Sequence, residues 1–130
     1  MQDSSGLQLL IAEDSPIVRE RLVALAREHL PAESIATVGN GADALAVFDR
    51  SAPDAVLLDI GLPDMSGLQV LEHIRRHGTS TEVVIFTNST GPEMAARCHL
   101  LGANHFVDKA HDIRPIIESL RTITAPKDRI

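Results

Sequence analysis

Short apolar runs alternate with stretches of helical periodicity along the chain, and this alternation limits the available folds more than any other feature. Five runs have the length and composition of buried strands, and they cover residues 7–12, 34–38, 55–59, 82–87 and 105–108. The stretches with helical periodicity cover residues 15–30, 40–52, 66–77, 92–102 and 112–123. Buried strands joined by helices form parallel sheets covered on both faces. Right-handed crossovers then favour a doubly wound α/β sandwich.

Capping residues support these helix boundaries. Ser15 can cap the first helix, and Pro16 suits its first position. Ser66 can cap the third helix, Gly102 can stop the fourth, and Pro115 falls in the first turn of the last. The apolar residues expected to face the sheet are Val18, Leu22, Leu25, Leu30, Leu45, Phe48, Val70, Leu71, Ile74, Ile113, Ile116, Ile117 and Leu120.

The composition is that of a soluble globular protein of one domain, with 130 residues of which 44% are hydrophobic and 23% charged. A net charge of −6, the lack of Trp and Tyr, and the lack of a basic stripe argue against nucleic-acid binding. Cys98 is the single cysteine, which fits a reducing compartment. The sequence has neither a signal-peptide pattern nor a membrane-span-length apolar run, so we expect a cytoplasmic protein without membrane contact.

Ionisable or hydroxyl side chains end or directly follow four of the five predicted strands, whereas the second strand is followed only by Gly39 and Asn40. Glu13 and Asp14 follow the first, and Asp59 ends the third. Thr87 ends the fourth strand, and Lys109 follows the fifth. Ligands of open α/β sheets bind beyond the carboxyl ends of the strands, so we expect these side chains to gather at one edge.

The chemistry of this set predicts a magnesium and phosphoryl site. Clustered carboxylates repel one another unless a cation neutralises them, and oxygen ligands suit Mg²⁺. A phosphoryl group on Asp59 would present oxygens to the metal, to Lys109 and to Thr87. Asp59 is therefore a candidate nucleophile that forms an aspartyl phosphate, and the turn at Gly61 allows close backbone approach.

Four segments carry a family resemblance: "ED" at 13–14, "LLDIGLPDMSG" at 57–67, "FTN" at 86–88 and "GANHFVDK" at 102–109. Over about residues 7–123, the sequence closely resembles the receiver domain of two-component response regulators. The resemblance implies a flavodoxin-like sheet of five strands in the order 2-1-3-4-5. It also implies a receiver domain over residues 1–124, with 125–130 as a polar tail or the start of a linker.

The resemblance implies a role for each residue of the candidate site. By this resemblance, Asp59 is the phosphoacceptor. The metal ligands are Asp14 and Asp59, which bind Mg²⁺ directly, Glu13, which binds through water, and Gly61, which binds through its backbone carbonyl. The residues that sense the phosphoryl group are Thr87 as the switch hydroxyl, Lys109 as the phosphoryl-binding lysine and Phe106 as the switch aromatic. The phosphoryl donor would be a sensor histidine kinase or a phosphotransfer protein. Phosphorylation would alter the surface formed by the fourth helix, the fifth strand and the fifth helix, through which the domain would regulate a downstream protein partner or a C-terminal output domain. Homodimerisation through the same helices stays open.

Three positions depart from the usual receiver pattern. Ala110 replaces the proline after the lysine, and a cis bond before alanine would cost about 3 kcal/mol, so we expect a trans bond there. Asn88 replaces a small residue after the switch threonine, so we expect it to narrow access to the phosphoryl group and slow its hydrolysis. Phe106 replaces the more usual tyrosine and brings no phenolic hydroxyl.

We therefore expect a signalling module that catalyses only its own phosphorylation and slow dephosphorylation. Three other functions remain as alternatives. A Mg²⁺-dependent phosphatase with an aspartyl nucleophile would need a second acid where Gly61 stands. A flavin-binding protein would need aromatic residues and a hydroxyl-rich phosphate loop in place of "EDSP". A pseudo-receiver would signal without phosphorylation.

Outside this set, the sequence offers only weak candidates for a site. His73 and His77 are four residues apart on one predicted helix, a spacing that can bind Zn²⁺, but no third ligand is evident and we expect a solvated face. Cys98 is expected to be a small helix-face residue rather than a reactive thiol.

Overall fold

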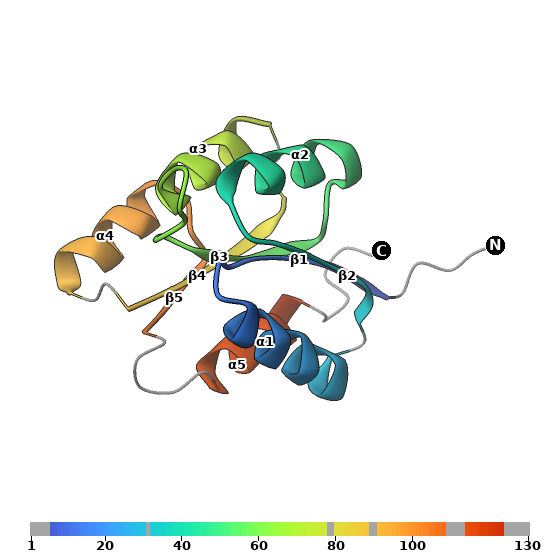
Figure 1. Cartoon of the computed structure of the whole chain (residues 1–130). Coiled ribbons are helices and arrows are strands. Elements are labelled where there is room, and N and C mark those ends of the chain that lie inside the picture. Colours follow the sequence, from blue (N-terminus) through green and yellow to red (C-terminus); the bar gives the residue numbers. More distant parts are fainter. Residues whose placement is uncertain (1–5, 31, 78–79, 89–90, 109–113, 124–130) are drawn as a thin grey trace.

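The structure is a computed structural model that describes residues 6–30, 32–77, 80–88, 91–108 and 114–123. Strands and helices alternate from end to end (Figure 1). The strands are β1 (Leu7–Ala12), β2 (Ala32–Val38), β3 (Ala55–Asp59), β4 (Glu82–Thr87) and β5 (His105–Asp108). The helices are α1 (Pro16–His29), α2 (Gly41–Ser51), α3 (Gly67–His77), α4 (Pro92–Leu100) and α5 (Arg114–Ile123).

The strands form one parallel sheet in the order β2-β1-β3-β4-β5, as predicted. Helices α1 and α5 cover one face, and α2, α3 and α4 cover the other (Figure 1). The chain passes from β1 to β2 in one direction across the sheet and then from β2 back past β1 to β3, so β1 lies between β2 and β3. In open α/β sheets, this reversal opens a crevice at the carboxyl ends of the central strands, where ligands bind.

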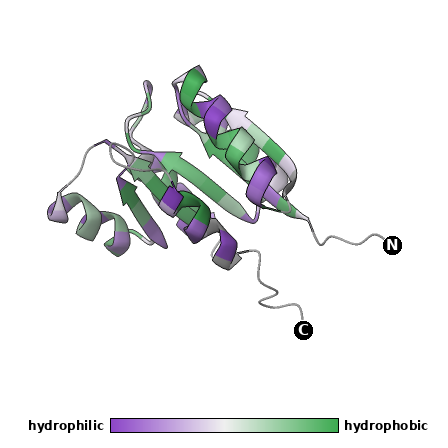
Figure 2. Ribbon diagram, turned by 90° about the horizontal axis from the view of Figure 1, so that it is seen from below, coloured by the Kyte–Doolittle hydropathy of each residue, from purple (hydrophilic) through white to green (hydrophobic). Residues whose placement is uncertain are grey.

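The core consists of two apolar layers, one on each face of the sheet. In β3, Val56 and Leu58 belong to the layer under α2 and α3, whereas Leu57 belongs to the layer under α1. All five residues of β3 are buried, because successive side chains point to opposite covered faces. Hydrophobic residues accordingly dominate the strands, while the helices also carry hydrophilic residues (Figure 2).

Four strands have the predicted boundaries, and β2 begins two residues earlier than predicted, at Ala32. Ser15 caps α1 as expected, since its hydroxyl accepts a hydrogen bond from the backbone N–H of Val18 at 3.3 Å. Helix α4 ends at Leu100, two residues before the predicted boundary. Gly102 has a φ of 109°, which a right-handed helix cannot contain.

Most of the predicted inward-facing residues that the structure describes are buried. Val70, Leu71 and Ile74 of α3 are fully enclosed, whereas Val18, Leu25 and Leu45 are only half-buried. Ile113, the side chain of Leu120 and the predicted tail at 125–130 lie outside the described residues, so the boundary of the domain stays a prediction. None of the described helices is both long and apolar enough to cross a membrane.

Candidate metal centre

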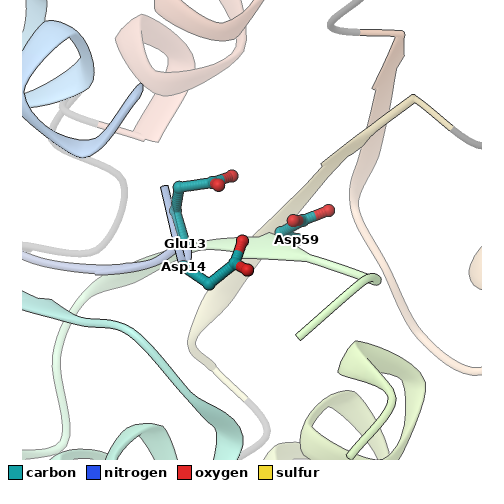
Figure 3. Close-up of side chains that lie close together, drawn as sticks. All are labelled: Glu13, Asp14 and Asp59. Atoms are coloured by element: carbon teal, nitrogen blue, oxygen red, sulfur yellow. The ribbon is translucent and has the colours of Figure 1, made fainter. Parts of the chain in front are cut away.

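Three carboxylates converge at the carboxyl edge of the sheet. Glu13 and Asp14 follow β1, and Asp59 is the last residue of β3, the strand paired with β1. Each side chain offers an oxygen that lies within 4.8 Å of the other two (Figure 3). Within the described part of the chain, no other three His, Cys, Asp or Glu side chains lie so close together. Because like charges at such distances repel strongly, a cation between them would stabilise the cluster.

Glu13 is almost completely buried, and several hydrogen bonds hold it in place. Its backbone N–H donates to the carbonyl of Val38 at 3.0 Å, and its Oε2 accepts from the N–H of Ser15 at 2.9 Å. Its carbonyl accepts from Nη1 of Arg19 at 2.7 Å. These contacts fasten the end of β1 to β2 and α1, and they fix the backbone that carries Asp14, whose side chain is exposed.

Asp59 is also buried, with 5% of its surface exposed. Its Oδ1 accepts a hydrogen bond from the backbone N–H of Gly61 at 3.2 Å. Gly67, the first residue of α3, lies directly against its main chain, because a Cβ at Gly67 would overlap the Asp59 carbonyl oxygen. The sequence "DIGLPDMSG" therefore places a glycine where the loop after β3 crowds against the strand end.

The three carboxylates line an open cleft of about 590 Å³. The cleft is lined by Glu13, Asp14, Ser15, Val18, Asp59, Gly61, Thr87 and Asn88. Thr87 is buried at the end of β4, next to β3, whereas Asn88 is exposed. Carboxylate, hydroxyl and carbonyl oxygens are the ligands that Mg²⁺ prefers, so the residues present fit this ion.

The structure therefore brings together six of the eight predicted site residues. Of the other two, Phe106 is half-buried on β5, opposite Ile85, and packs against the core layer under α2 and α3. Lys109 and Ala110 lie outside the described residues, so the roles expected for them stay predictions.

Sequence reasoning missed two residues that support this edge. Arg19 holds the carbonyl of Glu13, and Asp64 accepts hydrogen bonds from the backbone N–H groups of Gly41 and Ala42 at 2.7 and 2.9 Å. The hydrogen bonds from Gly41 and Ala42 lower the pKa of the Asp64 carboxyl. Asp64 and Gly41 are 23 residues apart, so no local pattern in the sequence predicts their contact.

His73 differs from its predicted solvated environment. It is half-buried, its Nε2 lies 2.8 Å from Oδ1 of Asp49 on α2, and its ring meets the edge of Phe48 at a centroid distance of 6.0 Å. His77 is exposed, and its Nδ1 lies 2.9 Å from the carbonyl oxygen of His73. His73 therefore contributes to the contact between α2 and α3.

The doubly wound parallel sheet, with an oxygen-rich cleft at its switch point, defines a flavodoxin-like α/β protein with a candidate divalent-metal site. The family model described as "Response regulator receiver domain" matches residues 9–121. The chain therefore belongs to the receiver domain family of two-component response regulators, in which phosphorylation and Mg²⁺ binding are characteristic.

Individual relatives agree with this assignment. The chain is 31% identical over 121 residues to the probable transcriptional regulatory protein TcrX of Mycobacterium tuberculosis, covering 93% of this chain and 51% of that protein. It is 35% identical over 112 residues to the protein-glutamate methylesterase/protein-glutamine glutaminase of Treponema pallidum, covering 84% of this chain and 28% of that protein. The chain spans about half the length of the first curated relatives that it matches.

A solved structure shares the fold over nearly its full length. The crystal structure of a DNA-binding response regulator of the LuxR family from Staphylococcus aureus superposes with a TM-score of 0.82 at 30% identity. The match covers 91% of this chain and 98% of that one. The predicted flavodoxin-like receiver fold is thereby confirmed.

Proposed function

We propose that the chain accepts a phosphoryl group on Asp59 from a sensor histidine kinase or a phosphotransfer protein in a Mg²⁺-dependent reaction. The observation that carries the proposal is the meeting of Glu13, Asp14 and Asp59 within 4.8 Å beside an open cleft. Asp59 ends β3, which lies between β1 and β4 in the sheet, so groups from both neighbouring strands can reach a phosphoryl group bound to it.

In the transfer step, a carboxylate oxygen of Asp59 attacks the phosphorus of a phosphohistidine. The new O–P bond forms as the N–P bond breaks, and the electron pair of that bond returns to the imidazole nitrogen. Glu13, Asp14, Asp59 and the carbonyl of Gly61 would hold Mg²⁺, which would neutralise the charge of the carboxylates and the transferring group. The chain's own contribution is mainly positioning, because Glu13 and Asp59 are buried and held by backbone hydrogen bonds.

The phosphoryl group would then be recognised from two further strands. Thr87, which lines the same cleft, would donate its hydroxyl to a phosphoryl oxygen, and Lys109 after β5 would supply a cation. Movement of Thr87 would leave space for Phe106 to turn inward, and the surface of α4, β5 and α5 would change with it. Asn88, exposed at the rim of the cleft, would restrict the approach of water to the acyl phosphate.

The output of the switch belongs to a partner or to a further domain. The named relatives are transcriptional regulators and a methylesterase that are longer than this chain, so their regions outside the match would carry those activities. For this chain we propose a signalling role in the cytoplasm, with turnover limited to its own phosphorylation and slow dephosphorylation. Its contacts would be with protein, including homodimerisation through α4 and α5, and not with nucleic acid or membrane.

An aspartyl-nucleophile phosphatase is the second candidate, because it uses the same carboxylate and metal chemistry. The two candidates differ in the residue two positions after the nucleophile. Here that residue is Gly61, which has no acidic side chain to protonate a leaving group. A phosphatase would turn over phosphate monoesters repeatedly, whereas a receiver would take up one phosphoryl group and release it slowly. A pseudo-receiver would take up none.

The test is incubation with acetyl phosphate or carbamoyl phosphate and Mg²⁺, followed by intact mass measurement. We expect one added phosphoryl group, lost in Asp59→Asn and when EDTA removes the metal. Asp54→Asn is the matched control, because Asp54 precedes the same strand and its carboxylate accepts a backbone hydrogen bond from Gln8 at the opposite edge of the sheet. A folded wild-type protein that gains no phosphoryl group from any donor would overturn the proposal, and turnover of a phosphate monoester would favour the phosphatase.

A further inference from the structure

The loop between β3 and α3 is fastened to the first turn of α2 by one carboxylate. Oδ1 of Asp64 accepts from the backbone N–H of Gly41 at 2.7 Å, and Oδ2 accepts from the N–H of Ala42 at 2.9 Å. The next N–H of the helix, that of Asp43, donates to the side chain of Asn40 at 2.8 Å. The first three N–H groups of α2 are thus satisfied, two of them by a loop that lies more than 20 residues further along the chain.

Close packing reinforces this attachment. A Cβ at Gly41 would overlap Cγ of Met65, so the helix start and the loop fit together only because residue 41 has no side chain. The loop therefore docks on α2 through two neighbouring residues, Asp64 by hydrogen bonds and Met65 by contact. Both contacts limit the positions that the loop can take relative to α2.

The other side of the same loop carries the candidate metal centre. Gly61 and Ser66 form an antiparallel bridge, and the N–H of Gly67 donates to the carbonyl of Ile60 at 2.9 Å. The N–H of Gly61 in turn donates to Oδ1 of Asp59. The loop is therefore closed on itself, and a shift of Asp64 would be passed to Gly61 and to the carboxylate of Asp59.

We infer that Asp64 is a positioning residue for the metal centre, which acts by holding Gly61 and Asp59 in place through its attachment to α2. This inference rests on the proposed function, since it concerns the Mg²⁺ affinity and phosphorylation of the same site. Asp64 itself is exposed and does not line the cleft, so its effect on Mg²⁺ binding would be transmitted through the loop. Loss of a direct hydrogen bond to a metal ligand typically weakens metal binding by about 10- to 100-fold. Because Asp64 acts through the loop and its hydrogen bonds go to Gly41 and Ala42, we expect an effect near the lower limit of that range.

The test compares Asp64→Asn with Asp43→Asn. Both replacements remove an exposed carboxylate near the first turn of α2, one from the loop and one from the helix itself, but only Asp64→Asn disturbs the attachment of the loop. We measure the Mg²⁺ dissociation constant by titration calorimetry, the rate of phosphorylation by acetyl phosphate, and the melting temperature without metal. We expect Asp64→Asn to weaken Mg²⁺ binding by about tenfold and to slow phosphorylation in parallel, with Asp43→Asn within about twofold of the wild type.

The possible results distinguish a failure of this inference from a failure of the proposed function. A wild-type protein that neither binds Mg²⁺ nor becomes phosphorylated contradicts the proposed function and removes this inference with it. If the wild type binds Mg²⁺ and becomes phosphorylated but a folded Asp64→Asn variant has the same Mg²⁺ affinity, only the inference is contradicted. This holds even if the melting temperature of Asp64→Asn is lower than that of the wild type. Should Asp64→Asn fail to fold, Gly41→Ala displaces the loop through Met65 with every charge retained, and an unchanged Mg²⁺ affinity in that variant is equally contradictory.

Discussion

Arg75 of α3 reaches across the start of β4 and donates through Nε to the carbonyl of Gly102 at 2.9 Å. Its Nη1 donates to the carbonyl of Thr81 at 2.7 Å, and its Nη2 donates to Oδ1 of Asn104 at 2.8 Å. One guanidinium therefore joins α3 to the segments before β4 and before β5. This contact lies at the edge of the sheet opposite the metal centre, so it concerns stability rather than chemistry.

The first prediction tests this contact. Replacing Arg75 by Met keeps an apolar stem but removes three hydrogen bonds, and it leaves the carbonyl oxygens of Thr81 and Gly102 without this donor. Asn104 Oδ1 keeps its hydrogen bond from the backbone N–H of Val83. We expect a loss of about 2–3 kcal/mol in the free energy of unfolding. The matched control is Arg76→Met, because Arg76 is the exposed neighbour on the same helix. Urea denaturation followed by circular dichroism measures the free energy of unfolding of both variants. Equal stability of the two variants would contradict the structural role assigned to Arg75.

The second prediction concerns the two glycines of the loop after β3. A Cβ at Gly67 would overlap the Asp59 carbonyl oxygen, which is main chain and cannot move aside, whereas a Cβ at Gly61 would find Asp59 Oδ2 at 4.0 Å as its nearest neighbour. We therefore expect Gly67→Ala to cost about 1–3 kcal/mol in unfolding free energy and Gly61→Ala to change it by less than about 0.5 kcal/mol. Thermal or chemical denaturation of both variants checks this, and a Gly67→Ala protein as stable as Gly61→Ala would refute it.

The third prediction concerns the lifetime of the aspartyl phosphate. Asn88 is exposed and lines the cleft together with Thr87. In the proposed function, its side chain would restrict the approach of water. We expect Asn88→Ala to speed hydrolysis about threefold or more, equivalent to at least about 0.6 kcal/mol in activation free energy. Loss of the phosphorylated mass with time after removal of the donor gives the rate. A lifetime equal to or longer than that of the wild type would exclude this role for Asn88.

The fourth prediction is a pH dependence that arises from Asp64. Hydrogen bonds from Gly41 and Ala42 lower the pKa of its carboxyl in the folded protein below the ordinary value of 3.8. Stability from these bonds is therefore fully present above pH 3.8 and is lost as the pH falls through the lower pKa of the folded state. The melting temperatures of wild type and Asp64→Asn should differ by a constant amount between pH 7 and about pH 5, and should converge below pH 3.8. A difference that grows on acidification would contradict the assignment.

Much of the architecture could be read from local patterns. The run at 55–59 is a buried strand in the structure because both faces of β3 are covered, and such strands are apolar along their whole length. The start of α1 follows from Ser15 and Pro16, which satisfy the first turn without help from distant residues. Gly102 stops α4 as predicted, but the helix itself ends two residues before the predicted boundary, at Leu100. Strand β2 begins earlier than predicted, at Ala32, which pairs with Leu7 of the neighbouring strand.

The residues of the candidate metal centre could also be predicted from the sequence, but the residues that hold them in place could not. Glu13, Asp14 and Asp59 could be placed at one edge because parallel strands align their carboxyl ends, so chain position alone predicts their proximity. The contacts of Asp64 with Gly41 and of His73 with Asp49 join residues 23 and 24 positions apart. No periodicity encodes such pairs, since they arise only when two helices and a loop are packed together.

Strand and helix order, the parallel sheet and the identity of the acidic residues follow from the amino-acid sequence, because apolar periodicity and the ends of strands are local properties. The separation of the three carboxylates, the burial of Glu13 and Asp59, and the docking of the loop on α2 exist only in the folded chain. The physical reason is that distances and burial depend on how separate elements pack, which is set by the shapes of side chains far apart in the sequence.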